Sequence, residues 1–265
     1  MSAFVLKIIA LAAMLIDHAG AAFPDYIPFG TRIIGRLTFP IFVYLLADGF
    51  RHTRNPKKFL LRLFAFALIS EIPYDWAVTR ITNVQQGLSP WHVSFLNNTN
   101  IFFTLLLGGL AIFAFQQIWD AFVMPSDTES HEKKPLTKDL AGQYAVVVAM
   151  TAATTLAIMW IADFFGADYG GYGVLFILLM YVVKPRWLKF AVFTVMNVFQ
   201  HQWLRFVLQG YSFDTRYYLL VVATVLTLPL VALYNGKRGP SLKWLFYAAY
   251  PTHLAILAAI AWLVY

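Results

Sequence analysis

The residues of this sequence that are best suited to chemistry lie inside its apolar stretches. Asp17 and His18 lie late in the first apolar stretch, and His253 lies near the middle of the last one. An imidazole titrates near neutral pH, so a histidine can act as a general base or as an acyl-accepting nucleophile. We therefore expect His18 or His253 to deprotonate an acceptor or to carry an acyl group.

Further polar residues lie at the ends of other apolar stretches. A charged side chain costs at least a few kcal/mol at the bilayer centre, so each needs a partner, a cavity or a function. A helix rises about 1.5 Å per residue, and counting along each stretch places these polar residues at one depth near the outer face. We therefore predict a polar cavity that opens outward and has its floor near His253. These residues are Arg32, Arg36, Glu71, Asp75, Asn100 and Tyr169.

Buried ion pairs that only fix helix packing are the alternative for this set. Asp17 with Arg36, or Arg32 with Glu71, would be such pairs. Neighbouring residues of a helix point about 100° apart, so we do not expect Asp17 to orient His18, and we expect it to pair with Arg36. Two histidines within a membrane are hard to explain as packing, which favours the functional interpretation.

The elements that carry these residues are predicted to be membrane-spanning helices. Hydrophobic residues make up 60% of the 265 residues and charged residues 12%, a composition that excludes a soluble domain. We predict one all-α domain over residues 1–265, a polytopic transmembrane bundle of about nine helices, within a range of eight to ten. The expected segments are 3–22, 30–50, 59–78, 101–124, 140–163, 171–183, 187–203, 217–234 and 242–264.

Loop charge predicts the orientation. Lys and Arg gather in every second loop, which places the N-terminus in the cytoplasm. This pattern also argues against nucleic acid as the partner, although the net charge is +7. Residues 125–138 are expected to form a cytoplasmic linker. The first segment is longer than a signal-peptide core, so we interpret it as a span although Ala19-Gly20-Ala21 resembles a cleavage site.

Several kinds of site are excluded by residue type. The chain has no Cys, so disulfides, thiolate nucleophiles and Cys-ligated metals are absent. The other histidines lie in loops or at segment ends without a metal-ligand spacing, and no glycine-rich phosphate loop follows a strand. No metal is therefore expected.

Five short motifs, in one order along nearly the whole chain, resemble the TraX family of membrane proteins. The family's known member acetylates the N-terminus of F-type conjugative pilin. The matching pieces are Lys7-Ile8-Ile9-Ala10-x-x-x-Met14-x-x-Asp17-His18, Gly35-Arg36-x-x-Phe39-Pro40-x-Phe42, Asn100-Ile101-x-Phe103, Tyr169-Gly170-x-x-Gly173 and Tyr250-Pro251-x-His253-Leu254.

The resemblance extends to a wider group of transmembrane acyltransferases, and it implies an activity. It implies an acetyl-CoA-dependent acyltransferase in the inner membrane of a bacterium, acting on a pilin or another small membrane peptide. His18 and Arg36 would be active-site residues, with Arg36 stabilising an oxyanion or holding Asp17. Asn100 and Tyr169 would donate hydrogen bonds to acyl group or acceptor, and Glu71 and Asp75, with Arg32, would complete the substrate site. Arg51, Arg54 and Lys58 would bind the phosphates of CoA.

Two other functions stay open from the sequence. Buried His, Asp, Glu and Arg side chains also form proton relays, so the chain could be a proton-coupled transporter, although no inverted repeat is apparent. A noncatalytic scaffold for pilin maturation is the second alternative, and in that case the histidines would be replaceable.

Overall fold

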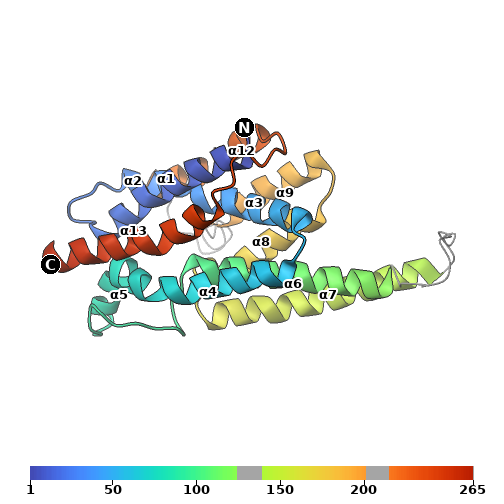
Figure 1. Ribbon diagram of the computed structural model, residues 1–265, viewed down its shortest axis with the longest axis horizontal. Coiled ribbons are helices and arrows are strands. Elements are labelled where there is room, and N and C mark those ends of the chain that lie inside the picture. Colours follow the sequence, from blue (N-terminus) through green and yellow to red (C-terminus); the bar gives the residue numbers. More distant parts are fainter. Residues whose placement is uncertain (124–138, 201–214, 265) are drawn as a thin grey trace.

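The computed structural model describes residues 1–123, 139–200 and 215–264, and its regular secondary structure in these ranges is entirely helical (Figure 1). The chain is therefore the predicted all-α, polytopic bundle. The expected linker at 125–138 lies outside the described residues.

Each of the nine expected segments contains helix in the described ranges. The helices are α1 (Ala3–Ala22), α2 (Gly30–Gly35), α3 (Thr38–His52), α4 (Pro56–Tyr74), α5 (Arg80–Gln85), α6 (Ile101–Phe122), α7 (Asp139–Phe164), α8 (Gly170–Val182), α9 (Arg186–Gln200), α11 (Thr215–Val225), α12 (Thr227–Ala232) and α13 (Lys243–Val264). A π-helical turn, Asp75–Thr79, joins α4 to α5.

Five described helical stretches are long and apolar enough to cross a membrane: Ala3–Ala22, Gly30–His52, Ile101–Phe122, Ala141–Phe164 and Lys243–Val264. The outer surfaces of these helices carry large apolar side chains. Trp160 on α7 is 67% exposed and Leu263 on α13 is 79% exposed. Such a surface is stable only against lipid or a partner, so the exposed faces of α7 and α13 fit a bilayer.

Three expected spans are interrupted: the segment 217–234, between α11 and α12, and two others near the polar residues. The second span divides between α2 and α3 at Arg36 and Leu37. The third contains Pro73, which removes one backbone hydrogen bond, and the π-helical turn begins two residues later. The breaks in the second and third spans therefore coincide with the positions of the predicted site residues.

The helices pack in two groups that α3 and α13 connect, since α3 packs against α6 and α8 (Figure 1). Helix α1 packs against α2, α3 and α13, while α6 packs against α4, α7 and α8. Helix α13 contacts both α1 and α4. Leu6, Phe39, Ile112 and Phe176 are among the fully buried side chains between the groups.

Backbone hydrogen bonds join the beginning of α1 to the loop that precedes α13. The Ala3 amide donates to the Lys237 carbonyl at 2.9 Å, and the Phe4 amide donates to the Arg238 carbonyl at 3.1 Å. The Asn235 amide donates to the Met1 carbonyl at 2.9 Å. Helices α1 and α13 are therefore connected at the end opposite to His18.

Candidate active site

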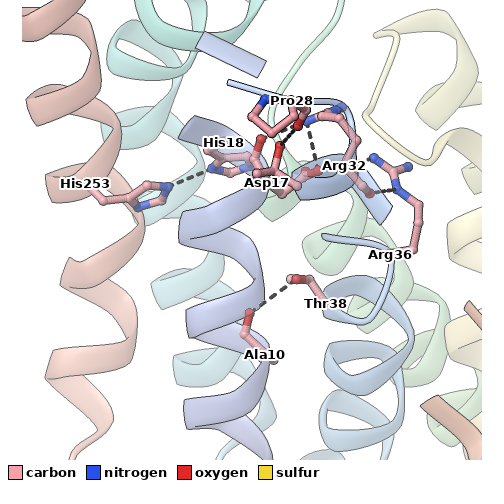
Figure 2. Close-up of polar contacts among 9 residues, drawn as sticks. Ala10, Asp17, His18, Pro28, Arg32, Arg36, Thr38 and His253 are labelled. Carbon is pink, nitrogen blue, oxygen red and sulfur yellow. Dashed lines mark hydrogen bonds and ion pairs between the residues drawn. The ribbon is translucent and has the colours of Figure 1, made fainter. Parts of the chain in front are cut away.

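His18 on α1 and His253 on α13 are in direct contact, although 235 residues separate them (Figure 2). Nδ1 of His18 lies 2.7 Å from Nε2 of His253. The ring planes differ by 10° and the ring centroids are 5.0 Å apart. That centroid separation is the N–N distance plus the two ring radii, so the imidazoles meet edge to edge in nearly one plane, as a linear hydrogen bond requires.

The second ring nitrogen of His253 determines where the protons lie. Nδ1 of His253 is 2.8 Å from the Ala249 carbonyl, which can only accept, so Nδ1 carries a hydrogen. In the neutral ring Nε2 then has the lone pair, and His18 must donate from its Nδ1. Nε2 of His18 is left as an acceptor. The geometry thus leaves His18 as the member of the pair with a ring nitrogen that can accept a proton, while both ring nitrogens of His253 are engaged.

Asp17, the residue before His18, binds two arginines (Figure 2). Its Oδ1 lies 3.0 Å from Nη1 of Arg32 and 3.6 Å from Nη2 of Arg36. Arg32 also donates to the Asp17 backbone carbonyl at 3.1 Å. The expected Asp17–Arg36 pair is present, but Arg32 is the nearer partner, so the alternative pairing of Arg32 with Glu71 is wrong.

Arg36 is held less tightly than Arg32. Its Nε donates to the Arg32 carbonyl at 3.2 Å, and its contact with Asp17 is the longer of the two. Its charge also interacts with Asp168 and Tyr169, which lie between α7 and α8. The guanidinium of Arg36 therefore does not spend all of its N–H groups on Asp17.

Gly35 allows α2 to approach α1 at this site. A side chain at position 35 would overlap the carboxyl group of Asp17. One helical turn further in, the Thr38 hydroxyl donates to the Ala10 carbonyl at 3.2 Å (Figure 2). These two contacts fix the Arg32–Arg36 segment against the Asp17–His18 segment.

The polar residues of α1 and α2 remain accessible. The side chains of Asp17, Arg36 and Arg32 are 13%, 19% and 31% exposed, and His18 is half-buried. Asp168 is exposed. His253 is 8% exposed, so it is the more buried member of the histidine pair. The outward-opening cavity itself stays a prediction.

Tyr169 is fixed by its ring. It stacks on Phe39 of α3 with centroids 3.5 Å apart, and its amide donates to the Thr104 hydroxyl at 3.3 Å. The residue thus joins the start of α8 to α3 and α6, within electrostatic range of Arg36.

Glu71 and Asn100 form a separate buried pair, and both side chains are fully buried. The Asn100 side-chain amide donates to Glu71 Oε2, and its backbone amide donates to the same oxygen at 3.1 Å. The same side-chain amide also donates to the Ala67 carbonyl at 2.8 Å. This pair joins α4 to α6. Of its side-chain oxygen and nitrogen atoms, only Glu71 Oε1 has no hydrogen bond within the described residues.

Asp75 holds the loop that follows the π-helical turn. One carboxylate oxygen accepts from the Ser94 amide at 2.7 Å and the other from the Thr79 hydroxyl at 3.0 Å. Both oxygens are therefore engaged by the protein, and the residue is not brought into contact with His18 or Arg36.

Tyr250 belongs to the site and was not among the predicted residues. Its ring centroid lies 5.7 Å from that of His18 and 5.6 Å from that of His253, with both pairs edge to face. A signal existed, because Tyr250 precedes His253 by one helical turn and therefore shares its face. Asp168, near Arg36, had no comparable signal, since it lies in a loop.

The three predicted cofactor residues lie at the other end of the bundle. Arg54 and Lys58 are exposed. Arg51 donates to the carbonyls of Met180, at 3.1 Å, and Tyr181. The structure thus separates these cations from the histidine pair. In the described ranges no group of three or more His, Asp or Glu side chains could hold a metal ion.

Comparison with known proteins supports the family resemblance that the sequence motifs indicate. The family model described as TraX protein matches residues 2–261. The chain is also 28% identical over 270 residues to "Probable fimbrial assembly protein FimC, serogroup H1" of Dichelobacter nodosus, which covers 97% of this chain and 95% of that protein. No solved structure matches the chain.

Proposed function

This chain belongs to the TraX family, and we propose that it is a membrane-embedded acyltransferase. It moves an acetyl group from acetyl-CoA to the N-terminal amine of a pilin or another small membrane peptide. The relative from Dichelobacter nodosus, named as a probable fimbrial assembly protein, supports a role in pilin maturation. We place the protein in the inner membrane of a bacterium, because acetyl-CoA is available there from the cytoplasm.

The contact between His18 and His253 carries this proposal. It supplies a neutral imidazole whose free Nε2 accepts a proton, held in orientation by a second histidine as a catalytic base is held by its orienting partner. The acceptor amine attacks the thioester carbonyl carbon, so a C–N bond forms and the C–S bond breaks. His18 takes the proton from the amine and delivers it to the departing CoA sulfur.

The arginines have different parts in this reaction. Arg32 holds Asp17 through two contacts and so fixes the end of α1. Arg36, with its longer contact to Asp17, is directed toward the negative charge that develops on the carbonyl oxygen. Tyr169, within electrostatic range of Arg36, is the second candidate donor to that oxygen.

The acceptor site is proposed around the carboxylates. Glu71 Oε1 is buried and has no hydrogen bond within the described residues, so it can bind the acceptor's ammonium group and take the proton that this group must lose before it attacks, while Asn100 fixes the other oxygen. Asp75 contributes charge at the same end of α4 but is engaged with Thr79 and Ser94. Arg51, Arg54 and Lys58 are proposed to contact CoA phosphates at the opposite end.

Acetyl transfer by the full-length protein tests the proposal. The purified protein in lipid nanodiscs is incubated with labelled acetyl-CoA and a synthetic apolar peptide that has a free N-terminus. The same peptide with a blocked N-terminus is the control. We expect label on the free peptide, and its loss in His18→Ala and Arg36→Ala proteins that still insert into membranes and elute as folded species.

The same reactions distinguish two chemical routes. Mass spectrometry that finds an acetyl group on His18 or His253 would establish covalent transfer, whereas label on the peptide alone favours direct attack. Full transfer by His18→Ala would refute the assigned role. Proton uptake driven by a substrate in proteoliposomes, without acetyl-CoA and without peptide labelling, would replace the enzyme with a transporter.

A further inference from the structure

A second polar cluster lies at the other end of the bundle from the histidine pair. We call it the Lys189 cluster, and its members are Tyr44, Asp48, Arg51, Arg186, Lys189 and Tyr234. Tyr44, Asp48 and Arg51 are spaced by four and three residues, so they share one face of α3. Lys189 and Arg186 lie in the first turn of α9, and Tyr234 follows α12.

The two arginines of the Lys189 cluster are held by backbone oxygens rather than by carboxylates. Arg51 donates to the carbonyls of Met180 and Tyr181 at the end of α8. Arg186 donates to the Ala232 carbonyl at the end of α12 at 2.8 Å. Carbonyls at helix ends orient a guanidinium but carry only partial charge, so most of the positive charge stays uncompensated.

Lys189 is the buried cation of this cluster. It is 9% exposed, and its ammonium lies 5.8 Å from the centroid of the Tyr44 ring. Within the described residues it has no ion pair and no hydrogen bond to a side chain. The nearby carboxylate of Asp48 instead accepts from the Tyr234 hydroxyl at 2.8 Å and lies 3.8 Å from His52.

The Lys189 cluster therefore holds three Lys or Arg cations and one carboxylate, and the charges of Arg51 and Asp48 both act on Lys189. A buried ammonium without an anionic partner is costly, whereas a doubly charged anion would compensate it. Arg51 and Arg186 are exposed, whereas Lys189 is buried. This arrangement admits an anion from the aqueous side.

We propose that the Lys189 cluster binds a phosphate group, with Lys189 and Arg186 as ligands alongside Arg51. The same chemistry is offered by the phosphates of coenzyme A and by the headgroup of an anionic lipid. Coenzyme A is the expected source, and this choice rests on the proposed function; the phosphate site itself does not. The inference adds Arg186 and Lys189 to the basic residues that the sequence indicated.

The spacing of the two sites favours coenzyme A. The Thr38–Ala10 hydrogen bond places these residues at one level of α3 and α1. His18 lies eight residues beyond Ala10, and Tyr44 lies six residues beyond Thr38 in the opposite direction, so the two sites are on the order of 20 Å apart. An extended pantetheine arm spans a distance of this order between phosphate and thioester.

Binding of coenzyme A to the full-length protein in uncharged detergent tests the site. Lys189→Gln removes the buried charge, and Lys189→Arg retains it. Lys184→Gln removes an exposed charge from the loop just before α9 and is the matched control. A charge-assisted hydrogen bond to phosphate predicts that Lys189→Gln weakens the Kd about tenfold or more. Lys189→Arg should stay within a few-fold, and Lys184→Gln should match the parent protein.

Retention on vesicles of phosphatidylcholine with and without phosphatidylglycerol provides the second arm. If Lys189→Gln loses only the preference for phosphatidylglycerol, the site exists and a lipid fills it. If Lys189→Gln and Lys184→Gln behave alike in both arms while Lys189→Gln elutes as a folded protein, the phosphate site is refuted. Acetyl transfer is read separately, so transfer that continues in Lys189→Gln with unchanged coenzyme A affinity and unchanged preference for phosphatidylglycerol overturns this inference and leaves the proposed function standing.

Discussion

Replacing His253 by asparagine or by glutamine separates its two hydrogen bonds. The asparagine amide reaches about as far as Nδ1 of the imidazole, so it can still donate to Ala249 but cannot reach His18. The glutamine amide extends to about the position of Nε2, so its oxygen can accept from Nδ1 of His18. The hydrogen-bond geometry therefore predicts higher activity for His253→Gln than for His253→Asn.

The size of the effect follows from burial. His253 is 8% exposed, so its loss leaves Nδ1–H of His18 facing a site with little water. A neutral hydrogen bond is worth about 1 kcal/mol and an unpaired buried donor costs up to about 3 kcal/mol, which corresponds to roughly 5- to 150-fold in rate. His253→Asn should lose that much kcat, with little change in KM, because the proposed acceptor site does not include His253.

Single-turnover acetyl transfer from labelled acetyl-CoA to the peptide measures this rate. Thermal melting of each variant checks that the bundle is intact. Equal rates for His253→Asn and the parent protein would show that the imidazole pair has no part in the reaction. Equal and strongly reduced rates for both variants, in stably folded proteins, would mean that an acceptor at this position is insufficient and that His253 itself handles a proton.

Three further results are expected. Gly35→Ala should lower kcat at least tenfold without unfolding the bundle, because the new methyl group displaces Asp17; an unchanged rate would contradict the close approach of α1 and α2. Arg36→Lys should lose most of the transfer rate, whereas Arg32→Lys should instead lose part of the thermal stability. Measurement of kcat and Tm for both variants compares them. Transfer should fall on acidification, because a protonated Nε2 of His18 cannot accept, and a rate that rises toward acid pH would exclude His18 as the base.

The positions of the helices could be predicted from the sequence because a membrane requires long apolar runs. The expected segment 3–22 is α1 to the residue, and 242–264 differs from α13 by one residue at its start. The break between α2 and α3 was not predicted, since Arg36 and Leu37 lie within one continuous apolar pattern. It depends on the contacts that α2 makes with α1.

The residues of the site were predicted better than their contacts. Helical spacing indicates which residues share a face, so Arg32 and Arg36 were expected together, and their carbonyl–guanidinium contact agrees. Helical spacing carries no information about which other helix that face packs against. The pairing of His18 with His253 therefore had no local signal, and neither did the pairing of Glu71 with Asn100, which directs those side chains to each other.

The backbone bonds between the start of α1 and the loop before α13 have a consequence for the imidazole pair. They set the axial register of the two helices, and a slip of one residue would shift a side chain by about 1.5 Å and rotate it by about 100°. Such a slip would turn His18 away from His253. The loop at 235–238 thus fixes the register of a contact at the far end of the helices, and an inserted residue there would misalign both rings without changing any residue of the site.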